Sequence, residues 1–146
     1  MRKHLNLRSF TLALMVLTGN YLSSLADFQA AIATTPDRIR QQQERLCREE
    51  QGNNIGIKAC IWLEYDTADR KLNEAYRQLT AKVSPEERSL LTEAQLGWIK
   101  LRDNTCEFEV YRSRGGTGFS GFLNACKTRI TNQRRVELER YLTKQN

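Results

Sequence analysis

The stretch AQLGWIKLRDNTC, residues 94–106, is the part of the chain that decides the fold. It places Gln95, Trp98, Arg102 and Cys106 at spacings of three, four and four, and side chains at such spacings lie on one face of an α-helix. The stretch therefore predicts a helix that aims an amide, an indole ring and a guanidinium toward the side on which the cysteine lies. Two interpretations fit this pattern: a binding site, or a polar brace inside a small protein stapled by disulfides.

Apolar residues recur at helical spacing through most of the chain, and no segment shows the sustained alternation of a strand. Four helices are predicted, at about residues 35–50, 57–82, 85–111 and 119–142. Thr35 with Pro36 opens the first helix, and Ser84, Pro85 and Glu87 form a capping box that opens the third. The predicted fold class is all-α, a small disulfide-stapled antiparallel bundle of one short and three longer helices.

Each longer helix has a predicted apolar face that turns toward the core. The second helix uses Ile61, Tyr65, Ala68, Leu72, Tyr76, Leu79 and Val83. The third uses Leu91, Ala94, Trp98, Leu101 and Phe108. The fourth uses Phe122, Leu123, Cys126, Ile130, Leu138 and Tyr141.

The four cysteines are placed symmetrically about two glycine-containing turns. Cys47 and Cys60 are equidistant from the centre of QGNNIG, residues 51–56, and Cys106 and Cys126 are equidistant from Gly116. Residues equidistant from the turn of an antiparallel helical hairpin lie opposite each other. We therefore predict the pairs Cys47–Cys60 and Cys106–Cys126; the nested alternative, Cys47–Cys126 with Cys60–Cys106, would tie the two hairpins together instead.

The N-terminal residues have the three parts of a secretory signal peptide. Arg2 and Lys3 begin it, an apolar run follows over residues 10–17, and small residues favour cleavage after Ala26, with a second possible cut after Ala33. A retained membrane anchor needs about 20 apolar residues, and Gly19, Asn20, Asp27 and Gln29 interrupt any run of that length. The predicted layout is a signal peptide (1–26), a flexible mature N-terminus (27–34) and one helical domain (35–146), exported to the periplasm or the medium, where cysteines oxidise.

His4 is the only histidine, and it lies in the predicted signal peptide. The mature chain would therefore have no imidazole for acid–base catalysis, for activation of a nucleophile, or for most catalytic metal sites. The widely spaced cysteines contain no C-x-x-C pair of the kind that holds zinc. We expect no enzyme, no cofactor and no metal.

The ordered motifs of the chain resemble those of the LprI-type lysozyme-inhibitor family, whose N-terminal domain was formerly a bacterial domain of unknown function. The matching positions are Cys60, Ala68, Asp69, Leu72, Asn73, Tyr76, Gln95, Trp98, Arg102, Asp103, Cys106, Cys126, Thr131, Arg134 and Leu138. The resemblance spans about residues 47–142. It implies an exported, disulfide-bonded helical domain without enzymatic activity and, for at least one relative, inhibition of lysozyme. The chain departs from the lipoprotein form of the family, because no cysteine follows the apolar run.

Three functions follow as hypotheses, and none involves nucleic acid or, after cleavage, a membrane span. The first is inhibition of a lysozyme by the loop that contains Arg112, Arg114, Gly115, Gly116 and Thr117, whose cations suit the carboxylates of a glycosidase cleft. The second is electrostatic binding of acidic envelope polymers by the basic segment 112–146, whose net charge is +6. The third is a helical adaptor for another envelope protein. An ordinary interhelical turn would also account for the glycines of the loop.

Arg102 lies in the middle of the inward face of residues 94–106, so its head group needs an acceptor. Asp69, at the edge of the second helix's apolar face, is the predicted partner, and Gln95 or Asn73 is expected to satisfy the remaining donors. The brace is therefore the preferred interpretation of the stretch, and Arg114 on the loop is expected to be dispensable for stability.

Overall fold

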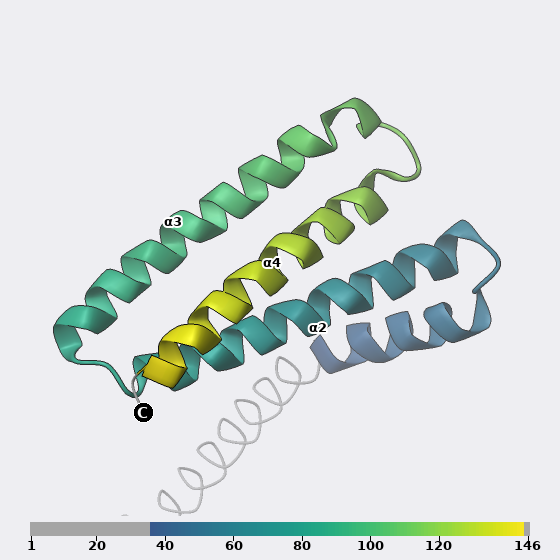
Figure 1. Ribbon diagram of the computed structural model, residues 1–146. Helices are drawn as coiled ribbons and strands as arrows, with labels where there is room; N and C mark the ends of the chain where they lie inside the picture. Colours follow the sequence, from purple (N-terminus) through teal and green to yellow (C-terminus); the bar gives the residue numbers. More distant parts are fainter. Residues whose placement is uncertain (1–35, 145–146) are drawn as a thin grey trace, which may run out of the picture. The chain divides into compact units, whose positions relative to one another are not determined.

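The computed structural model describes residues 36–144, which are almost entirely helical (Figure 1). Residues 36–49 form a first helix, and α2 (Asn54–Thr80), α3 (Pro85–Glu109), the short 3-10 helix η1 (Tyr111–Ser113) and α4 (Phe119–Lys144) follow. The described part of the chain contains no strand, so the all-α prediction is confirmed. The predicted signal peptide, its cleavage sites, the segment 27–34 and the Thr35 cap lie outside the described residues.

A glycine and an asparagine set the turn between the first helix and α2. The side-chain oxygen of Asn53 accepts hydrogen bonds from the backbone N–H groups of Ile55 and Gly56, at 2.8 and 3.1 Å, and so caps α2. A Cβ atom at Gly56 would overlap the backbone carbonyl of Glu50, so that only glycine fits at this position.

The capping box predicted at the start of α3 is confirmed. The backbone N–H of Glu87 donates to Ser84 Oγ at 3.2 Å, and the backbone N–H of Ser84 donates to the Glu87 carboxylate at 2.9 Å. Pro85 occupies the first helical position, where its missing N–H costs no hydrogen bond.

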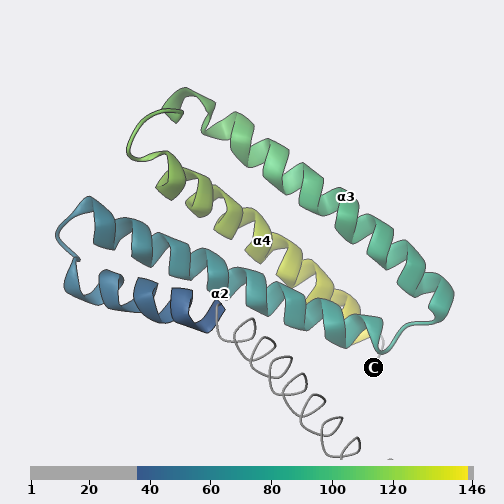
Figure 2. The ribbon, with the colours of Figure 1, turned by 180° about the vertical axis from the view of Figure 1, so that it is seen from behind.

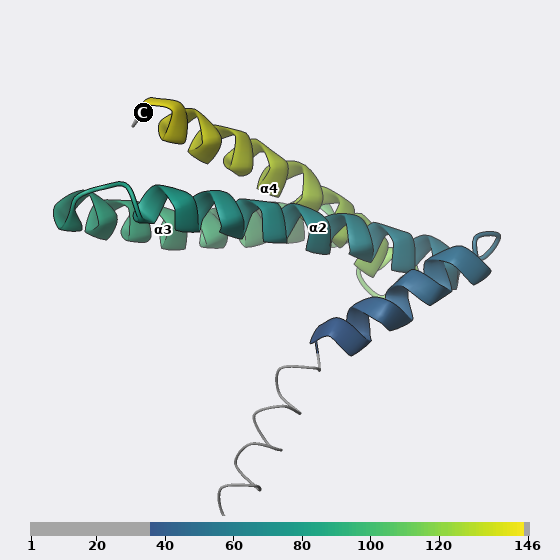
Figure 3. The same ribbon diagram turned by 90° about the horizontal axis from the view of Figure 1, so that it is seen from below.

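The core of the bundle lies where α2 meets α4. Leu72, Ala75 and Leu79 of α2 pack with Leu138 of α4, and partly buried residues of α3 such as Trp98 close over them. Figures 1 and 2 show α4 between α2 and α3, and Figure 3 shows that α4 rises from the level of the other two toward its C-terminal end. α4 is thus the helix that the other two share as a neighbour.

Each disulfide staples its own helical hairpin, as predicted. Cys47 pairs with Cys60, and Cys106 pairs with Cys126, with Cα–Cα distances of 4.8 and 5.6 Å. The nested alternative is excluded. The second bridge is the more deeply buried of the two, since Cys106 is 0% and Cys126 is 4% exposed.

The predicted apolar faces of α3 and α4 are partly wrong. Leu101 and Phe108 of α3 are 64% and 85% exposed, and Ala94 is exposed as well. Phe122 and Tyr141 of α4 are also exposed. The buried bridge explains the difference, because Cys106 must face Cys126 and thereby fixes the rotation of both helices about their axes.

Candidate functional site

The stretch 94–106 turns its polar face inward. Gln95, Arg102 and Cys106 are the buried residues of α3, and Trp98 packs against the hydrophobic core. Two of these buried side chains are polar, so each needs hydrogen-bond partners inside the protein. The geometry around them distinguishes a brace from a site.

Arg102 is the centre of an ion-pair cluster between α2, α3 and α4. Its Nη1 lies 3.6 Å from Asp69 Oδ1, and its Nε donates a hydrogen bond of 2.9 Å to Asp103 Oδ1. Lys127 Nζ, from α4, lies 3.3 Å from the same Asp103 oxygen. The predicted pairing of Arg102 with Asp69 is confirmed, and Asp103 with Lys127 extends the cluster to the third helix.

Two aromatic rings enclose the same guanidinium. The Cζ atom of Arg102 lies 5.1 Å from the centre of the Trp98 ring and 5.7 Å from that of Tyr65. Guanidinium groups at such distances are attracted to aromatic faces, more strongly where water is excluded. Burial raises the pKa of the Tyr65 hydroxyl, against the opposing effect of Arg102. Arg102 is therefore an occupied internal brace and is not available to a ligand.

Gln95 and Asn73 do not bind Arg102, and the prediction that they would is wrong. Gln95 Oε1 accepts a hydrogen bond of 3.1 Å from Nε of Arg134, and Asn73 Nδ2 donates one of 2.9 Å to Asp69. Gln95 lies two turns before Arg102 along α3 and meets a different cation of α4. Asn73 orients the acceptor of Arg102 instead of contacting Arg102 itself.

Arg134 is a second buried cation, which the sequence interpretation did not place in the interior. Its side chain is 9% exposed and pairs with Glu137 at 2.7 Å in addition to Gln95. The hydrogen bond from Arg134 lowers the pKa of the Glu137 carboxyl. Nearby Thr131 is fully buried, and its hydroxyl has no hydrogen-bond partner among the described residues. Gln95 was predicted to point inward, and a buried amide needs a hydrogen-bond partner inside the protein. This need was the signal that could have indicated a buried donor such as Arg134.

The remaining motif residues also serve the fold. Leu72 is a core residue that is 1% exposed, and the hydroxyl of Tyr76 forms a hydrogen bond of 2.9 Å with Thr92 that links α2 to α3. The residues that carry the family resemblance therefore lie mainly in and around the interior.

Acid is expected to destabilise the cluster through Asp103. Burial alone would raise the pKa of Asp103, but the hydrogen bond and charge of Arg102, together with Lys127, outweigh it and hold the pKa below the ordinary 3.8. A carboxyl group with a lowered folded-state pKa stabilises the protein above its unfolded pKa and loses this contribution as the pH falls through the folded pKa. The free energy of unfolding should therefore decrease as the pH is lowered below 3.8. Urea denaturation at a series of pH values measures this effect. The free energy of unfolding of Asp103→Asn should depend less steeply on pH than that of the wild type, and an equally steep dependence would contradict this role of Asp103.

The predicted binding loop lies at the exposed tip of the α3–α4 hairpin. Arg112, Arg114, Gly115, Gly116 and Thr117 are all exposed. Gly115 has a φ of 80°, a conformation that glycine adopts without strain. The structure thus brings the five loop residues together around η1.

The two arginines of the tip have different environments. Arg114 pairs with Glu107 and lies over the Tyr111 ring, with its Cζ 5.3 Å from the ring centre. Arg112 is exposed and has no ion-pair partner among residues 36–144. Arg114 therefore orients Tyr111, while Arg112 is the cation that remains available to a partner.

Two exposed aromatic residues accompany Arg112 at the tip. Tyr111 and Phe122 are 64% and 58% exposed. Phe122 lines a groove of about 410 Å³ between the ends of α3 and α4, and Val110 and Cys126 line it as well. Arg129 and Glu109 pair at 2.6 Å on the groove's edge. Aromatic and arginine side chains are the types enriched at protein-binding hot spots.

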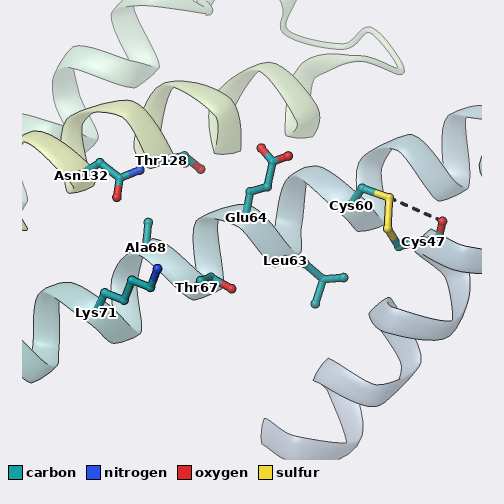
Figure 4. Close-up of a pocket in the computed structure, with 9 residues that line it drawn as sticks. All are labelled: Cys47, Cys60, Leu63, Glu64, Thr67, Ala68, Lys71, Thr128 and Asn132. Atoms are coloured by element: carbon teal, nitrogen blue, oxygen red, sulfur yellow. Dashed lines mark hydrogen bonds between the residues drawn. A yellow bond between two sulfur atoms is a disulfide. The ribbon is translucent and has the colours of Figure 1, made fainter.

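A second groove, of about 480 Å³, runs between α2 and α4 (Figure 4). It begins at the Cys47–Cys60 bridge and is lined by polar side chains such as Glu64, Thr67 and Asn132. The described residues contain no group of acidic, cysteine or histidine side chains that could hold a metal ion. The groove contains no nucleophile paired with a base.

The basic segment is largely neutralised within the domain. Five of its cations form ion pairs, namely Arg114–Glu107, Lys127–Asp103, Arg129–Glu109, Arg134–Glu137 and Arg135–Glu139. The net charge of the segment therefore overstates the positive surface that it offers to an acidic polymer.

Comparison with known proteins assigns the family. The model of the family described as lysozyme inhibitor LprI matches residues 47–138, more than half of the chain, including both disulfides. An uncharacterized protein of Rhizobium meliloti (strain 1021) is 29% identical in an alignment 112 residues long, which covers 68% of this chain and 80% of that protein. No solved structure matches the chain. No helix within residues 36–144 combines the length and apolarity that crossing a bilayer requires. With its two disulfide-stapled helical hairpins and the match over residues 47–138, the chain belongs to the lysozyme inhibitor LprI family.

Proposed function

We propose that this protein is exported to the periplasm or the medium and inhibits a lysozyme through the tip of its α3–α4 hairpin. Its family membership supports lysozyme inhibition, and its two disulfides are typical of proteins that fold in an oxidising compartment. One observation supports the tip as the binding surface: Tyr111, Arg112 and Phe122 are exposed together beside a buried disulfide.

The chemistry of the tip suits the cleft of a glycosidase. Such a cleft contains a pair of carboxyl groups beside its sugar subsites, and an arginine binds carboxylates through short, charge-assisted hydrogen bonds. Arg112 supplies this cation, and the rings of Tyr111 and Phe122 supply apolar area for the walls of the cleft. A tip of this kind blocks the cleft without performing any reaction itself.

The base of the tip is rigid, which favours tight binding. The Cys106–Cys126 bridge joins the two helices directly below η1, and Arg114 holds Tyr111 through its ring contact and its pair with Glu107. A pre-organised surface loses little conformational entropy on binding. Arg114 thus contributes to the site as a positioning residue.

Replacing Arg112 by alanine is expected to weaken inhibition by about thirtyfold, the effect of losing one hot-spot side chain. The measurement is the rate of cell-wall lysis by several lysozyme types at increasing concentrations of the oxidised protein. Arg140→Ala removes the same charge from an exposed position near the end of α4 and serves as the matched control. It should leave inhibition unchanged.

Two results would contradict the proposal at different levels. Failure to inhibit any lysozyme type would refute the function, whereas inhibition that Arg112→Ala and Arg140→Ala reduce equally would refute the tip as the site. Binding that is strongly weakened by salt and extends to acidic polymers would instead support an electrostatic role for the basic segment.

A further inference from the structure

An exposed row of residues follows the side of α3 that faces away from the core. Leu90 and Leu101 are 67% and 64% exposed, and the small residues Ala94 and Gly97 lie between them on the same side of the helix. We call Leu90, Ala94, Gly97 and Leu101 the α3 stripe. Its spacings of four, three and four keep all four positions in line along the helix.

Gly97 has no explanation within the single chain. It is the thirteenth of the 25 residues of α3, where glycine costs about 1 kcal/mol of helix stability relative to alanine. A Cβ atom at this position would meet nothing within 4 Å, so the domain's own packing does not require glycine. A glycine flanked by exposed leucines is suited to the close approach of a second helix.

The order of the stripe is the same in both directions. A leucine stands at each end, two small residues stand in the middle, and the spacings read alike from either end. A copy of α3 turned by 180° therefore places Leu90 against the other copy's Leu101, and Ala94 against its Gly97. A two-fold interface requires this kind of self-complementary surface.

The charges beside the stripe are also self-complementary. Glu93 and Lys100 lie along the same edge of the stripe, and neither has an ion-pair partner within residues 36–144. In an antiparallel helix pair, residues on the same edge of the two helices face each other. Glu93 of each copy then lies near Lys100 of the other, which favours the antiparallel arrangement.

We propose that the protein forms a two-fold symmetric dimer in which the α3 stripes of two copies pack antiparallel. The occupant of the stripe is thus a second copy of this chain, as both the residue order and the charges indicate. α3 is about 37 Å long, so that the antiparallel pair separates the two hairpin tips by roughly the length of the helix. The dimer does not depend on lysozyme inhibition; if both hold, the dimer presents two inhibitory tips.

Sedimentation of the oxidised protein, purified from the periplasm of an expressing cell, tests the proposal across a range of concentrations. The wild type should sediment as a concentration-dependent dimer. Leu101→Glu should weaken dimerisation by about a hundredfold or more, because each dimer would bury two unpaired carboxylates. Leu96→Glu is the matched control: Leu96 is 57% exposed, and it lies roughly 140° around α3 from Leu101.

A charge exchange tests the antiparallel register. Glu93→Lys alone should weaken the dimer, and Glu93→Lys combined with Lys100→Glu should restore it, since the exchange recreates both pairs. A wild type that remains monomeric at all concentrations would overturn the proposal, as would equal weakening by Leu101→Glu and Leu96→Glu. Failure of the double exchange to restore the dimer would overturn the antiparallel register. Circular dichroism of each variant excludes unfolding as the cause.

Discussion

Replacing Arg102 by methionine is expected to lower the free energy of unfolding by about 3 kcal/mol, at the lower end of the effect of breaking a buried ion pair. The side chain is 9% exposed, and its removal leaves Asp69 and Asp103 near each other without their shared cation. Both carboxylates keep some contact with water, at 37% and 40% exposure, which moderates the loss. Methionine approximates the volume of the arginine stem, so the loss reports mainly on the charge and its hydrogen bonds.

Two further variants identify the cause of this loss. Arg102→Lys keeps the charge but not the planar group between Trp98 and Tyr65, so its stability should be intermediate. Arg70→Met removes an exposed arginine that pairs with Asp66 on α2 and should change stability by less than about 0.5 kcal/mol. Urea denaturation followed by circular dichroism measures all three. Arg102→Met with the stability of the wild type would show that residues 94–106 do not form a brace.

Replacing Cys106 and Cys126 together by alanine is expected to destabilise the domain by about 3 kcal/mol, from the loop entropy that the bridge removes from the unfolded chain. The bridge spans 20 residues and fixes the orientation of α3 and α4. Its sulfurs are buried, so their loss also leaves poorly filled space between the helices. A loss of this size is a large part of the stability of a small domain.

The other bridge provides the comparison. Cys47–Cys60 spans 13 residues and joins the first helix to α2, whereas the hydrophobic core lies in α2, α3 and α4. Replacing Cys47 and Cys60 together by alanine should therefore lower the free energy of unfolding by less than replacing Cys106 and Cys126 does. A larger cost for this pair would contradict the assignment of the stabilising role to the α3–α4 hairpin.

The hairpins of this fold were predictable from the sequence, because the positions of cysteines and turn residues are local signals. The symmetric spacing about Gly116 predicted the pairing of Cys106 with Cys126, and Ser84 with Glu87 marked the start of α3. The inward face of α3 was harder to predict, since Leu101 is apolar and exposed while Arg102 is charged and buried. Hydrophobic periodicity fails where a helix carries apolar residues on its outer side and a polar brace on its inner side.

The candidate site was only partly predictable. The loop residues Arg112 and Arg114 lie together at the tip, but their different roles depend on Glu107 and Tyr111, whose positions follow from η1. Phe122 was assigned to the core because it is aromatic and in phase with Cys126. Phe122 is exposed because it lies in the groove at the end of the α3–α4 hairpin, where no other element among the described residues covers it.

The central claim is that the inner face of α3 stabilises the fold while the tip of the hairpin binds the partner. Hydrogen–deuterium exchange of the oxidised protein, with and without a lysozyme that it inhibits, tests this claim most directly. The account predicts slower exchange on binding in η1 and the loop that follows it, with little change at residues 94–106. Protection concentrated on the groove between α2 and α4, with the tip unchanged, would contradict it.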